Sequence, residues 1–415
     1  MKTNFRIYII ALFIMPSLIF ASGGSIYSRF GLGDFYQSFS SRRMAIGELG
    51  IAINDYDYLN NLNPASWSKL RLTRIETGII YHGNNISSNS SSVYYSQTIF
   101  TGFMLGFPID HDYGISLTAG LLPFSNVDYD VTTIENSELT ESYELTHSGK
   151  GGLSKSFIGI SYKLPFNFSI GASFDYYLGK ITNQSFINFS DSSQFRDGSF
   201  LDEYSYNGIG FSVGLISSNF APILKLSNIK DLRVGLIYSN NVTLKADTVN
   251  KSTTILGTIT NSSGRIKTNL PYKVGIGISL NWKGDYLFVF DYLYQPFNKF
   301  KIDNRNIKEL RNFQKLSIGF EYRKADIRSQ SFWEQVKFRG GLSYEKTQYY
   351  LNNTGIDMYA VYTGLSLPLG FESTLDLAFQ FGKRGTTENN LLKENIYKFS
   401  VTLSLGELWF LRQER

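Results

Sequence analysis

Three histidines are the side chains in this sequence best suited to acid–base chemistry: His82, His111 and His147. With a serine and a carboxylate, a histidine can form a hydrolytic triad, and chain order leaves this possibility open because triads are defined by geometry. However, no segment has a Gly-x-Ser-x-Gly motif in the strand–turn–helix context that presents such a nucleophile. We therefore interpret the histidines as ordinary loop or strand-end residues and predict no catalytic residue and no enzymatic activity.

Residues that could bind a metal ion are few. The histidines are scattered along the chain, and there is no cysteine to supply a thiolate. Asp55, Asp57 and Asn54 offer oxygen ligands, but the twelve-residue pattern of an EF-hand calcium loop is missing, so we interpret them as turn residues. No metal and no cofactor is predicted. The lack of cysteine also excludes disulfides and a lipidated amino-terminal cysteine.

The first residues have the features of a secretory signal peptide. Lys2 and Arg6 form a basic start, residues 7–20 form an apolar run, and small residues follow from Ala21. An uncleaved anchor helix is the alternative, but the run is short and interrupted by a proline. We predict a cleaved signal peptide over residues 1–21 and an exported protein.

The composition narrows the class further. Aromatic residues make up 16% of the chain and charged residues 18%, and the mean hydropathy is −0.14. After the signal peptide, no run approaches the ~20 apolar residues of a membrane helix. The net charge of +5 is spread along the chain without a basic stripe, so nucleic-acid binding is not predicted. These values leave a β-barrel or a large secreted β-protein.

Alternation with a period of two runs through the chain from residue 71 onward, as in β-strands. Residues 115–121, 274–280 and 399–406 show it most clearly, with apolar side chains on one face and small or polar ones on the other. About fourteen such segments are present, which is typical of outer-membrane barrels. A closed sheet of this size is too wide for side chains to fill, so we predict that the apolar face points outward to lipid. The fold class is thus an all-β transmembrane antiparallel barrel over residues 71–415.

Polar stretches separate the predicted strands. We interpret residues 164–167 and 367–370 as tight turns on the periplasmic side. Residues 84–92, 127–150, 185–203 and 248–267 are interpreted as outside loops.

Residues 22–70 do not follow the strand pattern and are predicted to form a plug, or hatch, inside the barrel. The segment is rich in glycine and small residues and contains Pro64, which lacks the amide that a strand ladder needs. Its apolar residues must pack on one another or on a hydrophobic guest, and both readings stay open. As a set they predict a ligand site at Phe30, Leu32, Phe35, Met44, Ile46, Leu49 and Ile51.

Charged residues on the polar side of the strands are predicted to line the lumen and to pair with plug residues, because buried charges need partners. A role for one arginine in binding a substrate carboxylate is the alternative. The predicted plug–lumen polar contacts are Arg29, Arg42, Arg43, Asp175, Asp291 and Arg339.

Several short motifs occur in order over the whole mature chain: residues 27–34 (Tyr-Ser-Arg-Phe-Gly-Leu-Gly-Asp), 45–52, 63–65 (Asn-Pro-Ala), 151–153 and 270–273 (Leu-Pro-Tyr-Lys). Together they resemble the FadL-type outer-membrane transport proteins, particularly members from Bacteroidota. The resemblance implies a monomeric fourteen-stranded barrel with an amino-terminal hatch. It also implies a hydrophobic ligand that is held beside the hatch and leaves through the barrel wall. The chain departs from the pattern at its end, where Trp409 and Phe410 precede a polar tail.

Two further predictions follow for the moving parts. Asn63, Pro64 and Ala65 are interpreted as the hinge between plug and wall, and Gly120 and Pro123 as a possible kink in a wall strand that opens a lateral exit.

The functional hypothesis is passive uptake of hydrophobic small molecules, such as long-chain fatty acids, across the outer membrane. Membrane lipid and the hydrophobic ligand are the predicted partners of a monomer. The alternative is an outer-membrane scaffold or secretion-associated barrel that binds protein partners through residues 127–150 and 185–203.

Overall fold

The computed structural model describes residues 24–135, 142–189, 195–324, 331–370 and 373–407. The predicted signal peptide, together with Trp409 and Phe410, lies outside these residues. No helix in the described part of the chain is long and apolar enough to cross a membrane.

The described residues form one closed antiparallel sheet of fourteen wall strands, in which the last strand, β19, pairs with the first, β2. The prediction of an all-β barrel with about fourteen strands is therefore confirmed. β8 with β9, and β10 with β11, each make up one wall strand in two segments. The wall elements are β2 (Thr73–Ser87), β3 (Ser92–Asp110), β4 (Ile115–Glu135), β5 (Tyr143–Lys163), β6 (Ser169–Phe189), β7 (Gly198–Ile216), β8 (Ile229–Ser239), β9 (Val242–Thr254), β10 (Gly257–Leu270), β11 (Lys273–Trp282), β12 (Tyr286–Gln295), β15 (Phe313–Tyr322), β16 (Lys337–Leu351), β17 (Thr354–Gly370), β18 (Ser373–Arg384) and β19 (Lys393–Glu407).

Two wall strands are interrupted in the middle. β8 and β9 pair with different halves of β7, and β10 and β11 pair in turn with β9 and β8. At the first interruption the side-chain oxygen of Asn240 accepts from the backbone N–H of Phe211 at 2.8 Å. At the second interruption, the side-chain oxygen of Asn241 accepts from the backbone N–H of Tyr272 at 2.8 Å. Asparagine amides thus replace backbone groups that the ladder lacks there.

The outer face of the wall is apolar and the inner face is polar or small. In β11, Ile276 and Ile278 are exposed, whereas Gly275, Gly277 and Ser279 are buried on the lumen side. This confirms the predicted direction of the alternation and gives the surface expected of a barrel in a bilayer. Other exposed outward residues are Phe100, Ile158, Phe174, Ile209, Phe290, Leu316, Ile318, Leu342, Val361, Phe379 and Phe399.

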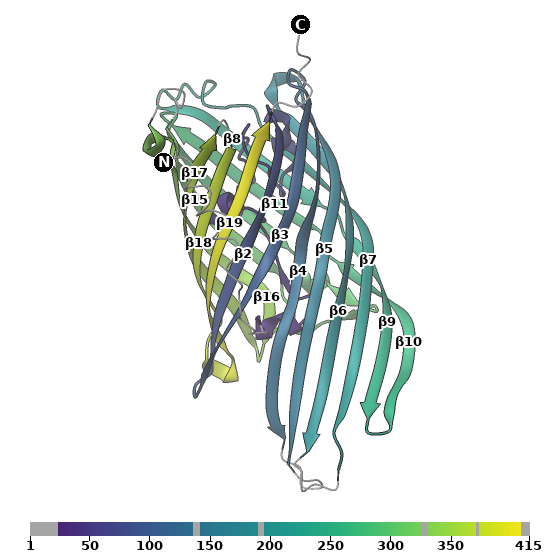
Figure 1. Cartoon of the computed structure of the whole chain (residues 1–415). Helices are drawn as coiled ribbons and strands as arrows, with labels where there is room; N and C mark the ends of the chain where they lie inside the picture. Colours follow the sequence, from purple (N-terminus) through teal and green to yellow (C-terminus); the bar gives the residue numbers. More distant parts are fainter. Residues whose placement is uncertain (1–23, 136–141, 190–194, 325–330, 371–372, 408–415) are drawn as a thin grey trace, which may run out of the picture.

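The two ends of the barrel differ. At one end short turns join the strands, as at residues 111–114 and 283–285. At the other end β4 to β7, β9 and β10 extend well beyond the rest of the wall as a sheet (Figure 1). Short turns are typical of the periplasmic end of outer-membrane barrels.

The prediction of long outside loops was largely wrong. Most of residues 127–150, 185–203 and 248–267 are strand, and β2 continues through residue 87. Both faces of the extended strands meet water, so they lack the apolar alternation that identifies a strand in sequence. Backbone pairing satisfies their amides all the same, for example between Val131 and His147.

The plug segment lies in the lumen (Figure 1) and is almost entirely buried. Ser40 caps its helix α2 by accepting from the N–H of Arg43 at 3.4 Å. Gly47 and Gly50 have positive φ values, which let the chain turn sharply after the helix. The plug elements are η1 (Ile26–Arg29), β1 (Asp34–Phe35), α2 (Ser41–Ala45) and η2 (Pro64–Lys69). The remaining short elements are η3 (Pro165–Asn167), η4 (Phe297–Lys299), β13 (Lys301–Ile302), β14 (Arg305–Asn306), η5 (Phe332–Gln335) and η6 (Glu388–Asn390).

Candidate functional site

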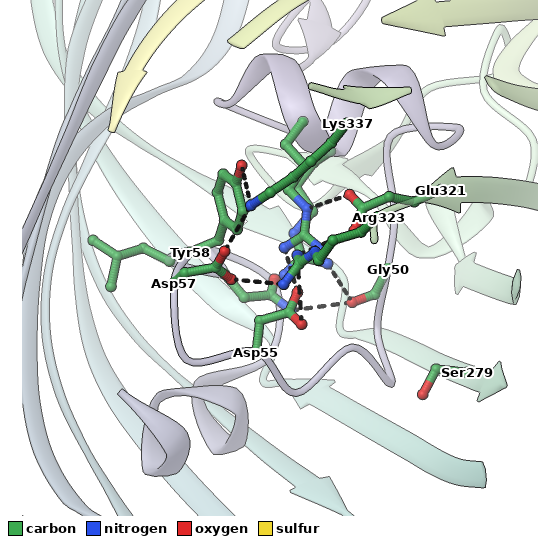
Figure 2. A network of polar contacts seen from close by, with 12 residues as sticks. Gly50, Asp55, Asp57, Tyr58, Ser279, Glu321, Arg323 and Lys337 are labelled. Carbon is green, nitrogen blue, oxygen red and sulfur yellow. Dashed lines mark hydrogen bonds and ion pairs between the residues drawn. The ribbon is translucent and has the colours of Figure 1, made fainter. Parts of the chain in front are cut away.

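A buried network of charges joins the plug to β15, β16 and β18, and we call it the plug network (Figure 2). Its members are Arg42, Asp55, Asp57 and Tyr58 of the plug and Glu321, Arg323, Lys337, Arg339 and Asp376 on the wall side. Arg42 Nε and Nη2 each donate to one carboxylate oxygen of Glu321 at 2.9 Å, and Arg42 also pairs with Asp55. Such a bidentate ion pair fixes the relative orientation of the two side chains in addition to pairing their charges.

Wall residues complete the pairing. Arg339 donates to Glu321 at 2.6 Å and to Asp376 at 3.0 Å. Asp57 accepts from Lys337 at 2.9 Å and from Arg323 at 3.3 Å. Burial alone would raise the pKa of Asp57, but the charges of Arg323 and Lys337 outweigh it and hold that pKa well below its usual value. Both plug carboxylates are thus anchored to cationic side chains.

A second polar contact holds the turn after α2 against β12. Asp291 accepts from the N–H groups of Gly50 and Ile51 at 2.8 and 3.0 Å. Arg43 closes the same turn from within the plug by donating to the carbonyl of Gly50 at 3.1 Å. A Cβ on Gly277 would lie 2.9 Å from that of Ile51, so only glycine leaves room for this approach.

Of the six residues predicted to form plug–lumen polar contacts, four lie at the contacts between plug and wall and two do not. Arg42, Arg43, Asp291 and Arg339 lie in or beside the plug–wall contacts described above. Asp175 instead accepts from Ser173 and Ser212 of the wall at 2.9 and 2.7 Å, because these serines lie on the same inner face. The exposed Arg29 lies over the ring of Phe30, 4.6 Å from its centroid, within the plug itself. The contacts of these last two residues therefore differ from the prediction.

The apolar plug residues that were predicted to bind a ligand are packed against the protein. Leu32, Leu49 and Ile51 belong to the largest apolar cluster, with Phe30 and Phe35 against its edge. Ile46 packs with Ile53 and Val289, and Met44 packs with Met358 and neighbouring residues. Of the seven, Phe35 and Met44 also line a cavity.

The wall splits between β3 and β4. Their pairing ends at Phe103 and Leu121, although both strands continue beyond these residues. Gly120 still pairs regularly with Met104 and Phe157, whereas the register between β4 and β5 shifts between Pro123 and Ser125. Figure 1 shows β3 and β4 diverging below this point. The outer part of β4 therefore has an edge that β3 does not cover.

Plug residues 24–36 occupy part of this edge. β1 pairs with Asn126 and Ser125 of β4, and the N–H of Gly24 donates to the carbonyl of Asp128 at 2.9 Å. On the far side, Asn84 of β2 donates to the carbonyl of Gly24 at 3.2 Å. The plug therefore adds a short strand to the free edge of β4 and is also bonded to β2, the neighbour of β3 in the wall.

A cavity of about 80 Å³ lies beside the split. It is lined by Phe35, Gln37 and Met44 of the plug and by His82 and Gln97 of the wall. Pockets for drug-sized ligands measure about 300–1,000 Å³, so this volume suits a few water molecules rather than a fatty acid. Polar atoms of Gln37, His82 and Gln97 are buried there without a described hydrogen-bond partner.

Glu48 borders the same cavity and carries a second set of ion pairs. It pairs with Lys315 and, at 3.7 Å, with Lys398. Burial would raise the pKa of Glu48, but the two ammonium groups outweigh it and lower the pKa to about 2. A third set joins Asp34 of β1 to Arg384 of β18 at 3.0 Å.

The predicted hinge residues form a buried junction. Asn63 caps η2 by accepting from the N–H of Ala65 at 3.1 Å, and its side chain donates to the carbonyl of Ile51 at 2.7 Å. Pro64 follows as the first residue of η2, which packs on β6. Whether this junction moves stays a prediction.

The three histidines lie in different parts of the structure. His82 lines the cavity, His111 lines a hollow at the short-turn end, and His147 contacts Ser185 on the extended sheet at 2.8 Å. Within the described residues, no group of three His, Cys, Asp or Glu side chains could hold a metal ion.

Sequence reasoning missed several members of these contacts. Asp57 was interpreted as a turn residue, and no role was predicted for Tyr58, Asp376 or Glu48. Two signals in the sequence could have pointed to these contacts. Asp376 alternates with apolar residues in its strand and so faces the lumen, and the plug has acids beside an aromatic ring.

A closed fourteen-stranded barrel with a folded amino-terminal segment in its lumen defines the class of plugged β-barrels. More specifically, the chain belongs to the BamG family, whose model matches residues 1–414. A search of curated proteins found no match.

Solved structures with the same fold include two toluene transporters and a FadL homologue. The toluene transporter TbuX of Ralstonia pickettii is 14% identical, with a TM-score of 0.59 over 89% of this chain and 99% of its own. A FadL homologue of Pseudomonas aeruginosa is 10% identical, with a TM-score of 0.57 over 88% and 98%. The toluene transporter TodX of Pseudomonas putida is 17% identical, with a TM-score of 0.56 over 88% and 97%. The predicted resemblance to FadL-type proteins is thus confirmed for the fold.

Proposed function

We propose that this protein is an outer-membrane channel for a hydrophobic small molecule and that the plug segment 24–36 gates a lateral route between β3 and β4. One observation carries the proposal. The pairing of β3 with β4 stops at Phe103 and Leu121, and β1 of the plug takes up the edge of β4 that becomes free. Residue pairs that form a two-residue strand separate more easily than the long ladders elsewhere in the wall.

The apolar surroundings of the split support a hydrophobic substrate. Phe35 contacts Phe124 of β4 with 5.3 Å between ring centroids, and Phe124 contacts Tyr177 at 4.8 Å. Withdrawal of β1 would expose these rings beside the outward apolar surface of the wall. An apolar molecule could then pass between lumen and bilayer without entering water, at a gain of about 25 cal/mol per Å² of apolar area kept from water.

Two of the similar structures are named as toluene transporters and one as a FadL homologue, and we extend only the general class, a hydrophobic small molecule, to this chain. Long-chain fatty acids and monoaromatic hydrocarbons are the two ligands to test first. The cleaved signal peptide, the outer-membrane location, a monomeric state and an origin in Bacteroidota are parts of the same proposal.

A disulfide across the gate tests the proposal, because the chain has no cysteine of its own. Phe35 and Ser125 are paired partners in β1 and β4, so the double variant F35C/S125C should form a disulfide that locks the plug to the wall. We expect oxidation to stop uptake of labelled palmitate or toluene into vesicles and reduction to restore it. The control is F290C/I318C, a pair within the wall away from the plug. Unchanged uptake by the fully oxidised gate variant would contradict the proposal.

A second candidate function, a scaffold for protein partners, is favoured by the extended sheet. Residues 257–266 of β10 pair with β9, and none of their described pairings is with a strand on the other side. The first eight of these residues carry no charge and no proline, the usual protection of an edge strand. An extended segment of another protein could therefore add to this edge.

Shortening the β9–β10 hairpin distinguishes the two functions. Replacement of residues 250–262 by Asn-Gly leaves the plug and the split untouched. A scaffold would lose its co-purifying proteins. A channel without partners would have none to lose and would keep its uptake of hydrophobic molecules.

A further inference from the structure

A large hollow opens at the short-turn end of the barrel, opposite the extended sheet, and we call it the periplasmic bowl. Its volume is about 1,240 Å³. Plug residues around Asn54 and residues 68–72 form one part of it. Residues at the turns after β3, β5, β7 and β11 form much of the rest, together with Arg233 of β8 and Arg323 after β15. Neither the uptake route nor the extended sheet uses this surface.

The lining of the bowl is basic. Lys69, Arg71 and Lys163 line it and form no ion pair with any described residue. Arg233 and Arg323 also line it, paired with Asp231 at 2.8 Å and with Asp57 at 3.3 Å. The acid among the described lining residues is Asp55, which is already paired with Arg42. Three positive charges are therefore available to a ligand.

Unsatisfied amides lie in the same hollow. Both side-chain polar atoms of Asn54 and the side-chain oxygen of Asn281 are buried without a hydrogen-bond partner in the described structure. Leaving such a group unpaired costs about 1–3 kcal/mol. An asparagine amide has one donor face and one acceptor face, which match the two polar groups of a peptide unit.

The edge of the bowl is apolar. Phe166 and Ile223 project from the turns after β5 and β7 and are 88% and 69% exposed. Phe166 holds a positive φ of 62°, a conformation that a bulky residue rarely adopts without a local reason. Together the edge offers two apolar contacts beside the charged lining.

We propose that the periplasmic bowl binds an acidic polypeptide segment of a periplasmic partner protein. The three free cations come from η2, from the connection to β2 and from the end of β5, so they are spread over the lining and suit several carboxylates along a chain. The volume exceeds the ~300–1,000 Å³ of a single small-molecule site. The free amides suit a peptide backbone, and the apolar edge suits a hydrophobic side chain next to the acids.

The test uses the full protein in detergent and a fluorescein-labelled peptide rich in Asp and Glu with two leucines. Fluorescence anisotropy should report binding that weakens with salt, and a matched Lys-rich peptide should not bind. The variant K69Q/R71Q/K163Q should raise the Kd by about tenfold or more. The control K225Q/K245Q/K267Q removes the same charge from exposed residues outside the bowl and should leave the Kd unchanged.

Asn54→Ala provides an independent variant in case the triple variant folds poorly, as judged by heat-dependent migration of the barrel on gels. It should weaken peptide binding without changing its dependence on salt, because it removes hydrogen bonds and no charge. Equal weakening by the bowl and control triples would overturn the proposal. So would preferential binding of vesicles of anionic phospholipid over the acidic peptide, which would assign the bowl to lipid headgroups.

Discussion

The ring of Tyr58 lies against the guanidinium of Arg42, whose Cζ is 4.1 Å from the ring centroid. Both residues belong to the plug, yet each also contacts the wall: Arg42 through Glu321, and Tyr58 through its hydroxyl, which accepts from Arg339 at 3.2 Å. The pair therefore fixes two separate parts of the plug, α2 and the stretch around residue 58, to the same part of the barrel.

Substitution of Tyr58 should loosen the plug in two steps. Tyr58→Phe keeps the ring over Arg42 and loses the hydroxyl bonds, at a cost of about 1 kcal/mol. Tyr58→Ala removes the buried ring as well and should cost about 3–5 kcal/mol. Hydrogen exchange of plug amides, compared with amides of β12, measures both effects. Equal loss of protection in the plug and in β12 would show that Tyr58 stabilises the whole barrel instead.

Neutralising Glu321 should release the plug more strongly. Glu321→Gln leaves Arg42 and Arg339 buried without their shared carboxylate, and breaking a buried pair costs about 3–5 kcal/mol. We expect increased ion conductance in planar bilayers as the lumen opens. Glu334→Gln, which breaks an exposed pair with Lys324, is the matched control and should conduct like the wild type. Closed behaviour of Glu321→Gln would mean that other contacts suffice to hold the plug.

Two adjacent glycines of β16 give a sharper comparison. A Cβ on Gly341 would lie 2.6 Å from the backbone nitrogen of Gly47 in the plug, whereas a Cβ on Gly340 would meet its nearest atom at 3.9 Å. Gly341→Ala should therefore displace the plug and lower the thermal midpoint by several degrees, while Gly340→Ala should leave it unchanged. Differential scanning calorimetry measures this contrast. Similar midpoints for the two variants would contradict the packing described between plug and wall.

The sequence predicted the barrel because lipid on one side and a polar lumen on the other impose alternation, as in β11 and β19. The extended parts of β4 to β7, β9 and β10 were not predicted as strand, because water on both faces removes the alternation of apolar and polar residues. The interruption at Asn240 and Asn241 was missed for another reason, since a strand that continues after a break reads as two strands.

The plug contacts could be predicted by type and only partly by partner. Buried charges such as Asp291 and Arg339 had to find partners, and they did. Asp175 has the same position in its strand pattern, but its partners are wall residues, namely two serines and Lys155 at 3.7 Å. Which inward residue meets the plug depends on the path of an irregular segment, and no periodicity encodes that path.

The most direct test of the lateral route is the position of a photoreactive fatty acid during uptake. After illumination, mass spectrometry would identify the labelled residues of the reconstituted protein. We predict labelling of Phe35 and of wall residues beside the split, such as Ile99 and Phe124, and loss of this labelling when the F35C/S125C disulfide is closed. Labelling restricted to the outward surface of the wall, unaffected by the disulfide, would contradict a gated passage between β3 and β4.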